Sequence, residues 1–169
     1  MMHILRRRCT PLAVAGLLSL MSGSVLAAEG DTTTINITGT LVDAPECTVN
    51  SNNKVDVSFG NDIITYQVSG ENYKKQIPYT LTCTSLSKQG LIMTLNGTGA
   101  SFNSALFKTN KTGLGIRILS GTSVVSPGGK VAFNYTSQPV LYAVLVAQNT
   151  STLTTGTFSG TATMVIAYQ

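Results

Sequence analysis

The sequence predicts an all-β fold, a β-sandwich with immunoglobulin-like topology, and three observations lead to this prediction. From position 28 onward Thr, Ser, Val, Asn and Gly dominate, a composition suited to strands and turns. Short apolar or alternating runs recur between turn-forming stretches such as SNN, NGTG and SPGG. No stretch shows convincing helical periodicity. Many short strands at this spacing are typical of a sandwich, and we expect a single domain.

The segment 1–27 has the pattern of a secretory signal peptide. Three arginines at positions 6–8 precede an apolar run over positions 12–21. Val25 and Ala27 occupy positions −3 and −1 of a cleavage site after Ala27. The apolar run is shorter than the ~20 residues that a membrane-spanning helix needs. We therefore expect the segment 1–27 to be removed on export.

The remaining chain, 28–169, has no features of an enzyme or a nucleic-acid-binding protein. It is long enough for one domain with a hydrophobic core. Three of the eleven basic residues leave with the leader, so eight remain against seven acidic residues and the net charge is +1. The only histidine, His3, is also in the leader. We therefore expect no nucleic-acid partner, no catalytic residues, and no cofactor or metal site.

Two cysteines remain in the exported chain, Cys47 and Cys83. In an exported protein an even pair is typical of a disulfide, whereas two cysteines without a histidine or a carboxylate cluster are a poor zinc ligand set. We expect the disulfide, which would tether the opening strand to the strand that ends at Cys83. In the chain-entropy model a loop of this size stabilises the fold by about 4 kcal/mol.

Alternation of apolar and polar side chains identifies the expected strands of the first half of the chain. In order, they are TTTINITGTLV at 32–42, KVDVSFG with Val55, Val57 and Phe59, QIPYTLTC with Ile77, Tyr79, Leu81 and Cys83, and GLIMTLNG with Leu91, Met93 and Leu95. Pro78 favours an edge or a bulge, because proline has no N–H to donate. The SGEN stretch is expected to be a turn, and the polar segment 96–113 a loop.

Four further segments follow in the second half. GLGIRIL directs Ile116 and Ile118 inward and Arg117 outward, and SPGGKVAF makes a turn followed by Val131 and Phe133. VLYAVLVA at 140–147 is continuously apolar and suits a strand covered on both faces. The expected strand at 157–168 places one set of residues on a single face: Phe158, Gly160, Ala162, Met164, Ile166 and Tyr168.

The two ends of the chain present opposite problems. The strand at 32–42 is long and uncharged and lies at a free end, where an exposed edge promotes aggregation. If the strand at 157–168 is the sixth of the sandwich, no later segment can supply the seventh. Its edge and part of the core would then lack partners. We therefore expect one strand too many at one end and one too few at the other.

The chain after the leader resembles subunits of pili built by the chaperone–usher pathway, especially type 1-like fimbrial pilins. The resemblance is carried by TINITGTLVDAPECTVN, by a second cysteine after IPYTLT, by GLGIRIL and by GTFSGTATMVIAYQ. In the last stretch Gly156 is fourteenth from the end and Tyr168 is penultimate, as in the family's C-terminal motif. One departure is Glu46, which separates Pro45 from the cysteine where many relatives have Pro-Cys.

The resemblance implies an incomplete immunoglobulin-like sandwich that lacks its last strand and carries an N-terminal donor-strand extension. In that family a periplasmic chaperone lends the missing strand until the next subunit's extension replaces it. The implied organisation is a signal peptide at 1–27, the extension at 28–42 and a pilin domain at 43–169. The implied donor residues are Thr33, Ile35, Ile37, Gly39 and Leu41. The implied acceptor groove and chaperone contact comprise Gly156, Phe158, Gly160, Ala162, Met164, Ile166 and Tyr168.

The resemblance further implies a structural subunit of an adhesive surface pilus, exported through the periplasm to the cell-surface fimbrium. Its implied partners are a periplasmic pilus chaperone, an outer-membrane usher, neighbouring subunits, and a host receptor reached through the assembled fibre. The alternative is a receptor- or carbohydrate-binding module on the same fold, with contacts through loops such as 96–113. A tip adhesin of the family usually carries a separate binding domain ahead of its pilin domain, and the segment 28–169 leaves no room for one.

Overall fold

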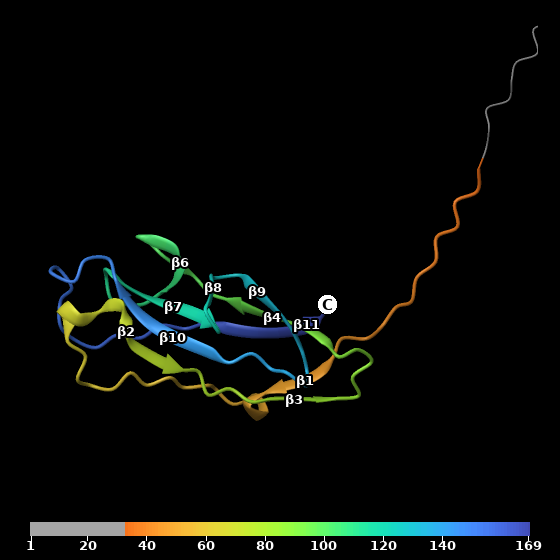
Figure 1. Ribbon diagram of the computed structural model, residues 1–169, viewed down its shortest axis with the longest axis horizontal. Helices are drawn as coiled ribbons and strands as arrows, with labels where there is room; N and C mark the ends of the chain where they lie inside the picture. The colour runs from red at the N-terminus through yellow and green to blue at the C-terminus, as the bar shows by residue number, and fades with distance from the viewer. Residues whose placement is uncertain (1–32) are drawn as a thin grey trace, which may run out of the picture. The chain divides into compact units, whose positions relative to one another are not determined.

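The structure is a computed structural model that describes residues 33–169. The expected signal peptide lies outside the described residues, as does the start of the N-terminal extension. Residues 33–45 have no regular secondary structure, and residues 40–169 form one compact unit. The strands, labelled in Figure 1 where there is room, are β1 (Glu46–Val49), β2 (Ser69–Gln76), β3 (Leu81–Thr84), β4 (Gly90–Asn96), β5 (Gly99–Ala100), β6 (Asn103–Lys108), β7 (Leu114–Ser120), β8 (Ser123–Val125), β9 (Gly129–Asn134), β10 (Leu141–Ala147) and β11 (Thr163–Tyr168).

The strands form three antiparallel sheets, which confirms the all-β prediction. β1 pairs with β3. The largest sheet has the order β2–β10–β7–β6–β5, with β8 also paired to β7. The third has the order β11–β4–β9. Figure 1 shows β4 and β11 side by side, with the C-terminus at the end of β11.

The main hydrophobic core joins the third sheet to the largest one. Leu91, Met93 and Leu95 of β4 are buried at alternate positions, as the sequence pattern predicts. They belong to one cluster with Ile118 of β7 and Leu141 of β10. β10 is buried at consecutive positions over 143–145, in agreement with a strand covered on both faces. A smaller cluster contains Val68, Leu114 and Leu145.

The expectation that 96–113 is a loop is wrong. This segment contains β5 and β6, and its Leu106 and Phe107 are each 2% exposed. A Cβ atom at Gly97 would lie 2.6 Å from Cδ1 of Phe107, so the glycine makes room for the ring. The segment has no hydrophobic alternation because Leu106 and Phe107 are adjacent and are surrounded mainly by polar residues and glycines.

The SGEN stretch is also not a turn, because it begins β2. Most side chains of β2 are exposed, and β2 is an edge strand of its sheet, with β10 as its one partner among residues 33–169. An edge strand with little buried surface can be polar along most of its length, so hydrophobic alternation did not reveal it.

Several expected strands are absent or shorter in the structure. Residues 33–42 and 54–60 form no strand, QIPYTLTC is a strand only from Leu81, and the C-terminal strand covers only Thr163–Tyr168. A strand requires a paired backbone, and hydrophobic alternation alone does not supply the partner. Val55, Val57 and Phe59 are nevertheless half-buried between exposed neighbours, as their alternation predicts.

Cys47 and Cys83 form the predicted disulfide, at directly opposite positions of β1 and β3. We expect thiol labelling of folded, non-reduced protein that lacks residues 1–27 to find no free cysteine. The double variant Cys47→Ser, Cys83→Ser should lose about 2–5 kcal/mol of unfolding free energy, measured by urea denaturation. Two reactive thiols in the native wild-type protein would contradict this pairing.

The partly buried hydroxyl of Tyr79 leads us to expect a fall in the free energy of unfolding at alkaline pH. Its hydroxyl donates to the Pro139 carbonyl at 2.5 Å, and burial raises the pKa of Tyr79 to about 12. The unfolded pKa is about 10, so the unfolded chain loses this proton first. The neutral hydroxyl therefore contributes stability that is complete below pH ~10 and is lost as the pH rises towards ~12. Tyr79→Phe should show a smaller fall in unfolding free energy between pH ~9 and ~11 than wild type.

The matched control for Tyr79 is Tyr66, which is 70% exposed. Tyr66→Phe should keep the wild-type pH dependence. Identical alkaline profiles for wild type, Tyr79→Phe and Tyr66→Phe would contradict the role of Tyr79.

Candidate functional site

One edge of β11 is unpaired in the described structure. The Gln169 N–H donates to the carbonyl of Gly90. These two residues are opposite each other, because the β11–β4 pairing places Tyr168 opposite Leu91. In an antiparallel ladder hydrogen-bonded and non-hydrogen-bonded pairs alternate. The backbone N–H and C=O groups of Met164, Ile166 and Tyr168 therefore point away from β4. Among residues 33–169 no strand pairs with β11 at that edge.

The side chains at these three positions face the main core but are only half covered. Met164, Ile166 and Tyr168 pack against the main cluster, while Val165 between them is 45% exposed on the other face. The Tyr168 hydroxyl accepts a hydrogen bond from the N–H of Ser87 at 3.0 Å. In the C-terminal half of this face, backbone groups that point away from β4 therefore lie beside apolar side chains.

The N-terminal half of that face, residues 156–162, is not a regular strand. Gly160 forms an isolated bridge with Thr109, and a Cβ atom on Gly160 would lie 3.0 Å from Cδ1 of Ile116. Phe158 packs in the smaller core cluster, with its ring centroid 6.1 Å from that of Phe59. Gly156 has φ +121° and is exposed, as is Ala162.

A cavity of about 700 Å³ lies beside Phe158. Residues 57–65 form one side and residues 153–158 another. Its apolar lining includes Phe59, Leu114, Leu145, Leu153 and Phe158. We call this cavity, together with the unpaired edge of β11 and residues 156–162, the open groove.

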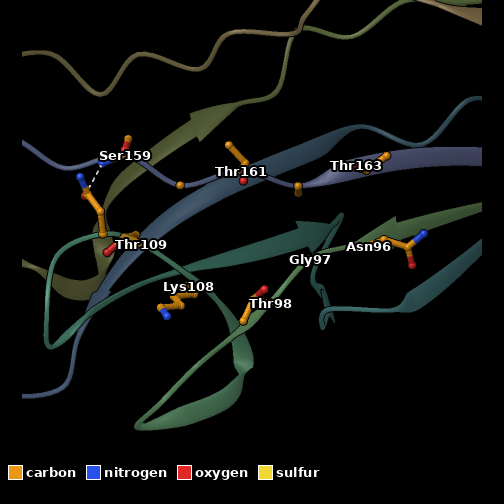
Figure 2. Close-up of a pocket in the computed structure, with 11 residues that line it drawn as sticks. Asn96, Gly97, Thr98, Lys108, Thr109, Ser159, Thr161 and Thr163 are labelled. Carbon is orange, nitrogen blue, oxygen red and sulfur yellow. Dashed lines mark hydrogen bonds between the residues drawn. The ribbon is translucent and has the colours of Figure 1, made fainter.

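The turn between β6 and β7 holds residues 155–160 in place. The Asn110 N–H donates to the Ser159 carbonyl at 2.9 Å, and the Ser159 N–H donates to Asn110 Oδ1 at 2.8 Å, the interaction dashed in Figure 2. The Lys111 ammonium donates to the Thr155 carbonyl. Thr109 anchors the turn, because its buried hydroxyl donates to the Leu114 carbonyl at 2.8 Å.

A second cavity, of about 500 Å³, lies between the end of β4 and residues 159–163 (Figure 2). Its lining is mainly hydroxyl, amide and backbone groups, with Lys108 as the charged member: Asn96, Gly97, Thr98, Lys108, Thr109, Asn110, Ser159, Gly160, Thr161, Ala162 and Thr163. Ligand pockets are lined predominantly by apolar and aromatic side chains with a few polar groups. No aromatic residue lines this cavity, so it offers no stacking surface for a sugar ring.

Within residues 33–169 no group of three or more His, Cys, Asp or Glu side chains could hold a metal ion. The same part of the chain contains no helix with the length and apolar character needed to cross a membrane.

Comparison with known proteins settles the family. Residues 35–169 match the model of the family described as fimbrial protein. The chain belongs to the fimbrial protein family. The uncharacterized fimbrial-like proteins YfcR and YfcQ of Escherichia coli K12 are 37% and 31% identical to it. The YfcR match covers 92% of each chain, and the YfcQ match covers 90% of this fimbrial protein and 96% of YfcQ.

Solved structures share the fold of this fimbrial protein. The P pilus rod subunit PapA superposes with a TM-score of 0.57 at 21% identity, covering 80% of this chain and all of PapA. The P pilus adaptor subunit PapF superposes with a TM-score of 0.53 at 25% identity. This match covers 75% of this chain and 98% of the PapF chain. The sandwich of this fimbrial protein is therefore of the pilin type, and the family is structural, not enzymatic.

The predicted donor residues lie in a segment without secondary structure. Ile35, Ile37 and Leu41 are 78%, 90% and 102% exposed, so their role stays a prediction. The alternation of KVDVSFG predicts that Phe59 faces inward, but no sequence pattern links Phe59 with Phe158. Nothing in the sequence singled out Lys111, which reaches the groove through a turn.

Proposed function

We propose that this fimbrial protein is a structural subunit of a surface pilus that polymerises by donor-strand exchange. The carrying observation is the unpaired edge of β11, where free backbone groups lie beside half-covered core side chains. A strand added there would pair with the N–H and C=O groups at 164, 166 and 168 and cover the apolar side chains. The N-terminal segment of another copy supplies that strand.

The chemistry of the groove favours one register for the incoming segment. An added strand that continues the antiparallel sheet runs opposite to β11. Gly39 has no side chain, and the position beside Gly160 has little room because Ile116 and the Lys108 backbone already fill it. Placing Gly39 opposite Gly160 puts Leu41 beside Phe158 and its cavity. In this register Ile37 lies opposite Ala162. Ile35 and Thr33 lie opposite Met164 and Ile166 of β11.

Three buried apolar side chains account for slow dissociation of the added strand. Ile35, Ile37 and Leu41 each contribute roughly 1.5–3 kcal/mol on burial, in addition to the new backbone hydrogen bonds. The same edge binds the strand of a periplasmic chaperone before assembly at an outer-membrane usher. Until it is covered, the edge favours aggregation of the lone subunit.

The alternative is a receptor- or carbohydrate-binding module on the same fold. Residues 96–113, expected to form its contact loop, instead contribute two strands, and the polar cavity beside them lacks an aromatic lining. The structural subunit is the better supported function, with any host receptor contacted by the assembled fibre.

A synthetic peptide of residues 32–45, capped at both ends, tests the proposal. The mature protein refolded with excess labelled peptide should retain it through gel filtration. A Leu41→Ala peptide should bind about 2–5 kcal/mol more weakly, because it leaves the cavity beside Phe158 unfilled. The control peptide Thr40→Ala changes the opposite face of the strand and should bind almost as wild type. No retained wild-type peptide, or equal loss with both variants, would contradict donor-strand exchange.

A further inference from the structure

Lys111 places a positive charge in the lining of a cavity whose other residues are a mixture of apolar side chains and uncharged polar ones. It lines the 700 Å³ cavity together with Leu114, Leu153 and Phe158. Its ammonium group lies 3.2 Å from where a Cβ atom on Gly156 would be. In the part of the chain that the structure describes, the ion pair present is Arg117–Glu71, at 3.8 Å, and Lys111 has no carboxylate partner. An ammonium group has three donors, of which the Thr155 carbonyl uses one.

A carboxylate occurs at the corresponding place in the donor segment. Asp43 is two residues beyond Leu41, so in an extended strand its side chain points to the same face. Asp43 is exposed and makes no hydrogen bond or ion pair within residues 33–169. In the antiparallel register that places Gly39 opposite Gly160, Asp43 comes opposite Gly156. This is the position of the Lys111 ammonium group.

We propose that Lys111 of one subunit binds the Asp43 carboxylate of the donor segment from a second copy, and that this ion pair reinforces the register set by the close approach of Gly39 to Gly160. The inference rests on the proposed donor-strand function. A slip of two residues keeps every side chain on the same face, so apolar burial alone distinguishes such registers weakly. A two-residue slip that brings Asp43 opposite Phe158 moves the carboxylate next to the apolar side chains Phe59, Leu153 and Phe158 of the cavity, which is costly without a partner. A slip the other way separates it from Lys111.

The test uses the 32–45 peptide, in which Asp43 is the sole charged side chain. Dissociation of labelled wild-type and Asp43→Asn peptides is followed from the refolded mature protein and from its Lys111→Gln variant. Loss of a partly exposed ion pair should speed dissociation about two- to fivefold, and more at low salt than at high salt. On the Lys111→Gln protein the two peptides should dissociate at the same rate. The control Lys108→Gln removes an exposed lysine that lines only the other cavity and should keep the full wild-type difference.

The outcomes separate this inference from the function on which it rests. Tight binding of both peptides with equal dissociation rates from wild-type protein would overturn the ion pair and leave donor-strand exchange intact. A difference that persists on the Lys111→Gln protein would assign the effect to another group and also overturn it. If no peptide binds at all, the proposed function itself is wrong. Because the Asp43→Asn change is on the peptide, the result does not depend on whether a groove variant folds.

Discussion

Ile166→Asp should abolish accumulation of the subunit and its co-purification with the chaperone. Ile166 lies directly opposite Met93, which is fully buried in β4, and packs against the main core. A carboxylate at this position must lose hydration in an apolar environment, at a cost of several kcal/mol unless it is protonated. That is a large fraction of the ~5–15 kcal/mol that stabilises a typical domain. The incoming strand would also meet the charge in the groove.

Val165→Asp is the matched control for this prediction. Val165 is the neighbouring residue on the same strand, but its side chain is 45% exposed on the outer face. The Val165→Asp protein should accumulate and bind chaperone at close to wild-type levels, measured by co-purification from the periplasm. Equal accumulation of the Ile166→Asp and Val165→Asp proteins would show that the inner face of β11 does not form the groove.

Ile37→Asp should have the opposite effect, damaging donation without damaging the fold. Ile37 is 90% exposed in the single chain, so a charge there leaves the subunit's own core unchanged. In a neighbour's groove the same carboxylate would be desolvated at a cost of several kcal/mol, which corresponds to a loss of affinity of a hundredfold or more. The variant should fold and bind chaperone normally but fail to displace chaperone from a second, groove-bearing subunit, as followed by native mass spectrometry.

Asn36→Asp controls for the added charge, because residue 36 points to the opposite face of the inserted strand. This variant should exchange at nearly the wild-type rate. Loss of chaperone binding by Ile37→Asp as complete as that of Ile166→Asp would place the N-terminal segment in the subunit's own core.

The parts of the fold predicted from sequence are those in which local pattern and burial agree. β4 alternates because one face is buried, and β10 is continuously apolar because both faces are covered. The inner face of the C-terminal strand was predicted through Met164, Ile166 and Tyr168, although the regular strand begins only at Thr163. β2 has no recognisable alternation because few of its side chains are buried, and β6 has none because its two buried residues, Leu106 and Phe107, are adjacent.

The site was only partly predictable for a different reason. The unpaired edge follows from one strand's pattern, but the cavity joins Phe59, Leu145 and Phe158, which are far apart in sequence. Lys111, in the turn after β6, lines the same cavity and donates to the Thr155 carbonyl. Its neighbour Asn110 accepts a hydrogen bond from the Ser159 N–H. Such long-range juxtaposition has no periodic signal, because it depends on how the sheets pack.

If the N-terminal segment of one subunit lies beside β11 of another, cysteines placed at facing positions will form a disulfide between the two chains. In the register with Gly39 opposite Gly160, residues 37 and 162 are directly opposite. Fibres assembled from the Ile37→Cys, Ala162→Cys variant should give a ladder of covalent oligomers on a non-reducing gel. Ile37→Cys combined with Val165→Cys, whose side chain is on the outer face, should give none. Cross-linking confined to single chains, or an equal ladder from both variants, would contradict donor-strand exchange between subunits.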